Sequence, residues 1–185
     1  MKIILASQSP RRKELLQSLG YDFQTVSIDV EEVFPADLPA ENVAGYLSEL
    51  KANAFRKLEK DEVLITADTV VVQNHEILGK PGDRKQAFEM IKKLSGNSHQ
   101  VFTDVTIKTS DTSVTKTDVS TVDFLEITDD EINFYIDRFQ PFDKAGSYGI
   151  QEWIGMAKIS RINGSFYTIM GLPTHLVEAE LSKLK

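Results

Sequence analysis

The sequence Val63-Leu64-Ile65-Thr66-Ala67-Asp68-Thr69-Val70-Val71-Val72 is a nearly unbroken run of apolar and β-branched residues. Such a run predicts a strand that is buried on both faces of a sheet. One charged side chain, Asp68, interrupts it. Because a lone carboxylate is costly to bury, this position predicts either an opening in the sheet or a cationic partner. Asp68 is therefore a candidate general base or metal ligand, and a structural ion pair is the alternative.

Outward from this run, hydrophobic periodicity predicts a mixture of strands and helices. The expected strands are Lys2–Ala6, Val63–Gln73, Val101–Thr109, Val114–Ile127 and Ala157–Asn163. The expected helices are Pro10–Leu19, Glu41–Leu58, Arg84–Leu94, Asp129–Phe139 and Thr174–Leu184. Strands and helices mix without strict alternation, which predicts an α/β or α+β fold with a mixed sheet.

Local sequence also predicts where some elements begin and end. Thr128 and Glu131 have the spacing of a capping box at the start of the fourth helix. Gly96 follows the third helix as a C-terminal cap. The Ser110-Asp111-Thr112 stretch predicts a turn between two threonine-rich strands, and therefore a hairpin.

Composition excludes several classes of protein. The chain has 185 residues, a formal net charge of −7 and no cysteine. These features argue against a disulfide framework, a thiol nucleophile and non-specific nucleic-acid binding. No apolar run approaches the length of a membrane span, and the apolar N-terminal stretch is too short for a signal peptide. We expect one cytoplasmic domain over residues 1–185, with neither a nucleic-acid nor a membrane partner.

The segment Ser7-Gln8-Ser9-Pro10-Arg11-Arg12 predicts a phosphate site. Ser9 can cap the helix, and Pro10 suits its first position. Arg11 and Arg12 then lie at the positive end of the helix dipole, where a bound anion would relieve their repulsion. Arginine also binds phosphate oxygens through two parallel hydrogen bonds. The alternative is a capped helix with two solvated arginines.

Three other motifs are less specific. Gly79-Lys80-Pro81 predicts a tight loop whose lysine can meet an anion, although on its own an ordinary turn explains it better. Glu31-Glu32, just past an expected second strand, suits Mg²⁺ or a solvated acidic loop. The glycines of the segment 144–151, Lys-Ala-Gly-Ser-Tyr-Gly-Ile-Gln, permit close approach of the backbone to a ligand. Lys51, beside an apolar helical stripe, is by default a surface lysine.

Together these motifs resemble the Maf family of nucleoside triphosphate pyrophosphatases. The matching pieces are the segments 6–16, 29–32, 50–52, 67–71, 79–81, 144–151 and 170–173, which occur in the family order and span almost the whole chain. The resemblance implies a two-lobed mixed α/β fold like that of the inosine triphosphatases, with a long mixed sheet flanked by helices and a central cleft. It also implies a homodimer.

The resemblance also implies roles for individual residues. Asp68 matches the proton acceptor, and Glu32 matches an acidic residue that would hold Mg²⁺ or Mn²⁺ with it, unless Glu31 takes that place. The expected basic and phosphate-binding positions are Lys51, Lys80, Arg11, Arg12, Ser7 and Ser9. The implied reaction is hydrolysis of a nucleoside triphosphate between its α and β phosphates, which yields the monophosphate and pyrophosphate.

Three positions resemble the dTTP/UTP branch of the family, namely Arg11, Thr69 and Gln151. An amide such as that of Gln151 offers a base both a donor and an acceptor. The alternatives are a pyrophosphatase for 7-methyl-GTP or another purine nucleotide, and a nucleotide-binding regulator of septum formation with little turnover. The chain departs from the family after Gln151, where Glu152-Trp153 replaces a more common glycine.

Overall fold

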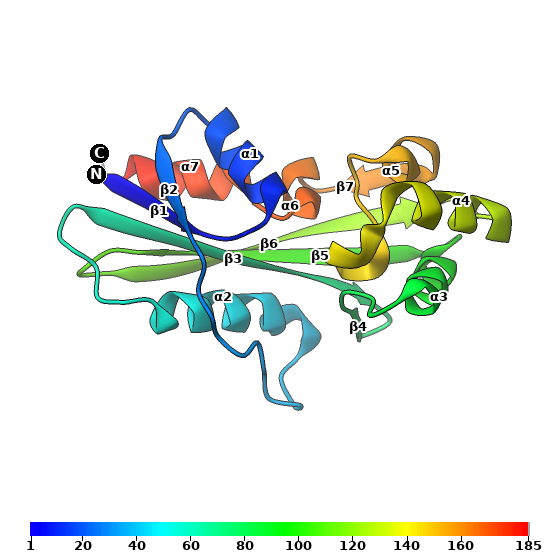
Figure 1. Cartoon of the computed structure of the whole chain (residues 1–185), viewed down its shortest axis with the longest axis horizontal. Coiled ribbons are helices and arrows are strands. Elements are labelled where there is room, and N and C mark those ends of the chain that lie inside the picture. The colour runs from blue at the N-terminus through cyan, green and yellow to red at the C-terminus, as the bar shows by residue number, and fades with distance from the viewer. Residues whose placement is uncertain (185) are drawn as a thin grey trace. The chain divides into compact units, whose positions relative to one another are not determined.

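The computed structural model describes residues 1–184 and contains one mixed sheet with helices against it (Figure 1). The strands are β1 Lys2–Ala6, β2 Phe23–Val26, β3 Glu62–Gln73, β4 Glu76–Leu78, β5 Ser98–Lys108, β6 Ser113–Phe124 and β7 Ile159–Asn163. The α-helices are α1 Pro10–Ser18, α2 Val43–Ala54, α3 Arg84–Leu94, α4 Asp129–Phe139, α5 Trp153–Ala157, α6 Phe166–Met170 and α7 Thr174–Ser182. Within these residues no helix is both long enough and apolar enough to span a bilayer.

The hydrogen-bonded order of the sheet is β2-β1-β3-β5-β6-β7, with β4 paired to β3. The strands β2 and β3 run parallel to β1, whereas β4 is antiparallel to β3 and β7 is antiparallel to β6. The predicted mixed α/β class is therefore confirmed.

Most predicted elements are confirmed, including the capping box of Thr128 and Glu131. The second helix is shorter than expected, because Ala40–Asn42 forms a 3-10 turn and Phe55 is already extended. The strand predicted from Ala157 begins only at Ile159. The residues before it form α5, where the carbonyl of Glu152 accepts hydrogen bonds from the first turn.

Contacts between residues divide the chain into two compact units. Unit 1 comprises Met1–Thr69, Thr103–Asp118 and the segment from Gly171 onward. Unit 2 comprises Val70–Phe102 and Val119–Met170. The expectation of a single two-lobed domain around a cleft stays a prediction.

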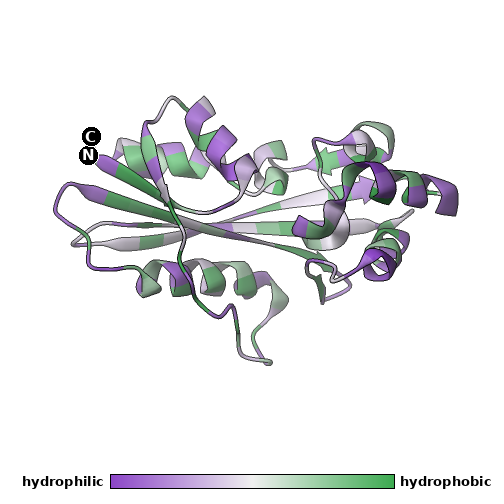
Figure 2. Ribbon diagram, in the orientation of Figure 1, coloured by the Kyte–Doolittle hydropathy of each residue, from purple (hydrophilic) through white to green (hydrophobic). Residues whose placement is uncertain are grey.

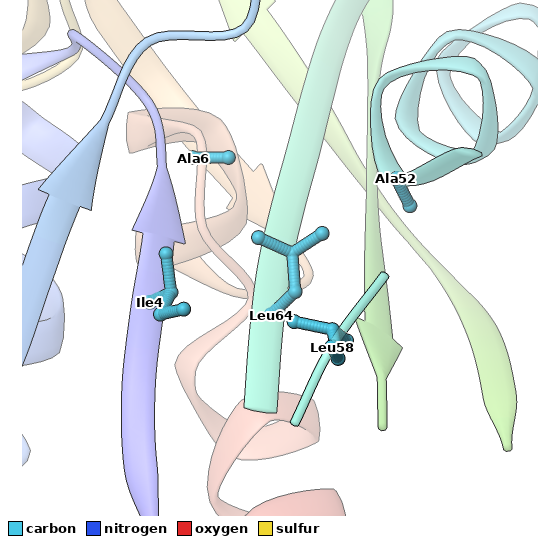
Figure 3. Packing of buried hydrophobic residues seen from close by; sticks show 5 residues of the cluster. All are labelled: Ile4, Ala6, Ala52, Leu58 and Leu64. Carbon is cyan, nitrogen blue, oxygen red and sulfur yellow. The ribbon is translucent and has the colours of Figure 1, made fainter. Parts of the chain in front are cut away.

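The core of unit 1 lies where β1 and β3 pack against α2. Ile4 is opposite Leu64 in the parallel register of β1 and β3. Figure 3 shows these two side chains with Ala6, Leu58 and Ala52, the last of which projects from α2. All five are buried. The predicted helix thus ends early, yet Leu58 beyond it still packs into this core.

The opposite face of the unit 1 strands is covered by α1 and α7 (Figure 1). Side chains alternate along a strand, so Ile3 and Leu5 point away from the α2 face. Leu16 of α1 and Leu181 of α7 are fully buried. The hydrophobic colour along most of β1 in Figure 2 agrees with burial on both faces.

In unit 2, α3 and α4 pack against each other beside the sheet. The buried residues of α3 are Ala87, Ile91 and Leu94, which recur at the spacing of one helical stripe. The helix α4 buries Ile132, Tyr135 and Ile136. Gly96 adopts a positive φ after α3, as expected of a C-terminal cap.

Unit 1 also buries a carboxylate that sequence analysis did not single out. The side chain of Asp104 on β5 is about 1% exposed. Its Oδ1 accepts a hydrogen bond from the Thr117 hydroxyl, and its Oδ2 has no partner among residues 1–184. Burial raises the pKa of Asp104 to about 6, the Thr117 hydrogen bond opposes this, and the charges of Asp68 and Glu49 add to it.

We expect the Asp104→Asn variant to be more stable than the wild type above pH 7 and to lose that advantage near pH 4. The folded chain binds the Asp104 proton more tightly than the unfolded chain, so the wild type loses stability as pH rises through about 6. The gain should be on the order of 2–3 kcal/mol. Urea unfolding at pH 4 and pH 8 would measure it, and a difference that does not change with pH would contradict an ionised Asp104.

Candidate active site

The loop between β1 and α1 has the geometry expected of an anion site. The hydroxyl of Ser7 accepts a hydrogen bond from the Ser9 N–H at 3.2 Å. Ser9 is the N-cap of α1, and its hydroxyl accepts the N–H of Arg12 at 3.5 Å. No acidic residue lies in the first turn of this helix. The first turn of α1 thus carries two arginines and no carboxylate at the positive end of the dipole, which favours an anionic ligand.

Arg12 is held by two hydrogen bonds within unit 1. Its Nε donates to the carbonyl of Gly171 at 2.7 Å, and its Nη2 donates to the Thr69 hydroxyl at 3.2 Å. Burial lowers the pKa of Arg12, Asp68 raises it, and Arg11 lowers it. Arg11 precedes Arg12 in the first turn of α1. The guanidinium of Arg12 is oriented by its two hydrogen bonds, and guanidinium groups are suited to binding phosphate oxygens.

Gly171 leaves room for this contact. It has a φ of +108°, and a Cβ there would lie 3.3 Å from the Thr69 Oγ1 and 3.7 Å from the Arg12 Nε. The Thr69 hydroxyl also contacts the Thr103 hydroxyl at 3.0 Å. The 170–173 motif was part of the family resemblance without a role of its own. Its glycine now has one, since its carbonyl orients the Arg12 guanidinium.

Lys51 joins the two candidate carboxylates of unit 1. Its Nζ lies 2.5 Å from Asp68 Oδ2 and 2.9 Å from Glu32 Oε1. The side chains of Lys51 and Asp68 are only 14% and 13% exposed, whereas that of Glu32 is about half exposed. The cationic partner predicted for Asp68 is therefore present. The default assignment of Lys51 to the surface was wrong, because α2 turns this side chain toward β3.

Asp68 is also fixed by the backbone next to it. Its Oδ1 accepts a hydrogen bond from the Thr69 N–H at 2.7 Å. Asp68 and Thr69 are the only partly exposed residues between Val63 and Gln73, since the rest of β3 is buried. Both oxygens of the carboxylate thus have donors, and the strand opens to solvent at this pair alone.

The two carboxylates fit a divalent cation. Glu32 and Asp68 converge on one ammonium nitrogen, and oxygen ligands of this kind suit Mg²⁺ or Mn²⁺. Glu31, the alternative ligand, is exposed, and its carbonyl accepts the Val33 N–H. Among residues 1–184 no three acidic, histidine or cysteine side chains are grouped for a metal. A cation held by Glu32 and Asp68 would take its remaining ligands from substrate phosphates and water.

Lys80 and Gln151, the two remaining candidates, belong to unit 2. Lys80 is exposed in the loop after β4, and the carbonyl of Gly79 before it accepts the Gly146 N–H at 3.1 Å. The structure therefore joins the 79–81 and 144–151 motifs, which are far apart in sequence. Gly146 has a φ of +67°, and a Cβ there would lie 3.0 Å from the Val71 side chain.

The exposed side chain of Gln151 extends from a turn that precedes α5. The carbonyl of Gly149 accepts the Glu152 N–H at 3.0 Å and closes this turn. The N–H of Gly149 donates to the Tyr135 hydroxyl at 2.9 Å. Sequence reasoning did not select Tyr135 or Glu152 as site residues, since their contact depends on how α4 packs.

The chain belongs to the Maf family, because the family model described as "Maf-like protein" matches residues 2–184. It is similar to proteins named dTTP/UTP pyrophosphatase. One from Bacteroides thetaiotaomicron is 49% identical over 99% of this chain and 96% of that protein. Another from Porphyromonas gingivalis is 49% identical over 97% and 92%. A third from Flavobacterium johnsoniae is 44% identical over 99% and 95%.

Two solved structures share the fold at lower sequence identity. A HAM1 protein from Coxiella burnetii is 12% identical with a TM-score of 0.57, covering 99% of both chains. The Ham1 protein of Staphylococcus aureus is 21% identical with a TM-score of 0.52, covering 100% of both chains. These similarities support the mixed α/β architecture expected from the sequence.

We expect Lys51→Met to lower the free energy of unfolding by about 2 kcal/mol. Removal of the ammonium leaves Asp68 without its cation, and the residual exposure keeps the cost below the ~3–5 kcal/mol typical of fully buried pairs. Urea unfolding of the two single variants, Lys51→Met and Asp68→Asn, and of the double variant would give the coupling energy.

The matched control is Lys92→Met, which breaks an exposed pair with Asp129. This variant should unfold at nearly the wild-type urea concentration, since exposed pairs contribute little. Equal losses at Lys51 and Lys92 would contradict a stabilising role for the Lys51–Asp68 pair.

Proposed function

We propose that this protein is a nucleoside triphosphate pyrophosphatase that hydrolyses dTTP and UTP to the monophosphate and pyrophosphate. The observation that carries the proposal is the pair Asp68-Thr69, whose side chains contact Lys51 and Arg12 respectively. A carboxylate that can accept a proton thus lies beside two fixed cations that can bind phosphate. The names of relatives that are 44–49% identical over nearly the full chain support the same substrates.

In the proposed reaction, a water molecule attacks the α phosphorus of the bound triphosphate. Asp68 accepts the proton of this water at a carboxylate oxygen, and the bond from the α phosphorus to the bridging oxygen breaks. Pyrophosphate leaves with that oxygen. A positioned general base typically contributes about 10²–10⁴-fold to the rate. Arg12 is orientated by Gly171 and Thr69, so it can stabilise charge on the phosphates without rearrangement.

Glu32 and Asp68 are the residues that would hold Mg²⁺ or Mn²⁺. The bound cation would neutralise phosphate oxygens and orient the in-line attack. Lys51 then has a second task, because it limits repulsion between the two carboxylates until the metal and the substrate bind. Ser7, Ser9, Arg11 and Lys80 complete the proposed set of phosphate-binding residues.

The preference for pyrimidines is assigned to Arg11, Thr69 and Gln151. Thr69 is well anchored, since its hydroxyl contacts both Arg12 and Thr103. Gln151 is exposed and can offer its amide to a base edge.

We also propose that the protein acts in the cytoplasm as a homodimer.

A nucleotide panel tests the reaction. With Mg²⁺ or Mn²⁺ present, we expect pyrophosphate and monophosphate from dTTP and UTP at rates well above those for GTP and 7-methyl-GTP. Chelation of the metal should abolish turnover, because the carboxylates and phosphates would then repel one another. Orthophosphate without pyrophosphate would mean that a different bond is cut. Nucleotide binding without turnover, in folded protein, would favour the regulator.

The Asp68→Asn variant tests the general base. We expect kcat to fall by about 10²–10⁴-fold, because the amide cannot accept the proton of the attacking water. Binding of dTTP with metal present, measured by calorimetry, should weaken far less than kcat falls, since the phosphate-binding cations remain. Wild-type turnover by this variant would remove Asp68 from the proposed role.

A further inference from the structure

Tyr135 of α4 makes two hydrogen bonds, one to a residue before Gln151 in the sequence and one to the residue after it. The Tyr135 hydroxyl accepts the N–H of Gly149 at 2.9 Å and donates to Glu152 Oε2. The Tyr135 side chain is fully buried. Burial and the neighbouring Glu152 carboxylate raise the pKa of Tyr135, so the phenol remains protonated and able to donate. The buried Tyr135 hydroxyl therefore holds the turn at Gly149 and at Glu152, on either side of Gln151.

Lys144 completes this cluster from the other side of the carboxylate. Its Nζ lies 3.1 Å from Glu152 Oε1 and 2.8 Å from Asp143 Oδ1. The side chains of Lys144 and Glu152 are 10% and 16% exposed. Each oxygen of Glu152 thus has its own donor, a phenol on one and an ammonium on the other. Two donors on a nearly buried carboxylate leave little freedom to rotate.

Gly149 and Gly155 allow the backbone around Gln151 to pack closely against neighbouring groups. A Cβ at Gly149 would lie 2.8 Å from Glu152 Cδ and 3.1 Å from Gln151 Nε2. A Cβ at Gly155 would lie 1.8 Å from the carbonyl oxygen of Ile150. The bare backbone of Gly149 therefore lies directly beside both the Glu152 carboxylate and the Gln151 amide. The position of the amide depends on the backbone below it, because the Gln151 side chain itself is exposed.

We propose that Tyr135, Glu152 and Lys144 are positioning residues that hold the Gly149–Gln151 turn and so set the Gln151 amide for recognition of a pyrimidine base. The inference rests on the proposed function, in which Gln151 reads the base. It also gives a role to Glu152, at which this chain departs from the family pattern. A base is discriminated by hydrogen bonds only when the protein amide is held in register with it, so loosening the turn weakens the correct base most.

The decisive variant is Tyr135→Phe, which removes both hydrogen bonds and keeps the ring. We expect the KM for dTTP and UTP to rise about 5- to 20-fold while kcat changes less than twofold. The ratio of kcat/KM for dTTP to that for GTP should fall by a similar factor. A purely structural role would lower the amount of active enzyme, and therefore apparent kcat for all nucleotides alike, without changing this ratio.

The matched control is Tyr21→Phe, which removes another tyrosine–glutamate hydrogen bond, from Tyr21 to Glu178 at 2.7 Å. It should leave both KM and the nucleotide ratio unchanged. Lys144→Met is the second variant, which keeps the test decisive if Tyr135→Phe does not fold. It should raise KM and lower the ratio in the same direction, because Glu152 then loses one of its two donors.

Gln151→Ala separates failure of this inference from failure of the proposed base reader. If Gln151→Ala loses the pyrimidine preference but folded Tyr135→Phe and Lys144→Met keep it, the positioning role is wrong and the reader stands. If Gln151→Ala keeps the preference, the assignment of Gln151 falls and the positioning role falls with it. Loss of preference in all three, with Tyr21→Phe unchanged, supports the proposal.

Discussion

The contact between Lys51 and Asp68 is the constraint on which the candidate site depends. Asp68 lies in a strand that is otherwise buried from Val63 to Gln73, apart from Thr69 beside it. A carboxylate at this place is tolerated because an ammonium lies 2.5 Å away. The same ammonium lies 2.9 Å from Glu32, so the helix α2, which buries Leu47 and Ala52, also presents one lysine to both carboxylates. The apolar core and the charged site of unit 1 thus share one helix orientation.

Much of the fold could be predicted from the sequence because the long elements carry their own periodicity and caps. The helix α4 has both an apolar stripe and the Thr128–Glu131 box, and its predicted bounds agree with the structure. The short helix α5 has neither. Its first turn is closed by the Gly155 N–H, which donates to the Glu152 carbonyl, and the backbone of Gly155 packs so closely on the Ile150 carbonyl that a Cβ would not fit. Such a constraint exists only after the chain has folded.

The residues of the candidate site differ in how clearly the sequence singles them out, for similar reasons. Asp68 stands out in sequence because a charge interrupts an apolar run, and the same rule would have found Asp104 in Val101–Lys108. Lys51 does not stand out, since many helices carry a lysine beside their apolar stripe, and only the family resemblance pointed to it. Tyr135 could not be assigned a role at all. Its hydroxyl acts on Gly149 through a tertiary contact that no spacing in the sequence encodes.

The close approach of Gly45 to Asp104 carries a consequence for how this sequence can diverge. A Cβ at Gly45 would lie 3.2 Å from Asp104 Oδ1, tighter than ordinary packing. A side chain at position 45 therefore requires the Asp104 carboxylate to shift by a few tenths of an ångström, and a smaller residue at position 104 would relieve that requirement. The tolerance of position 45 to substitution thus depends on which residue occupies position 104.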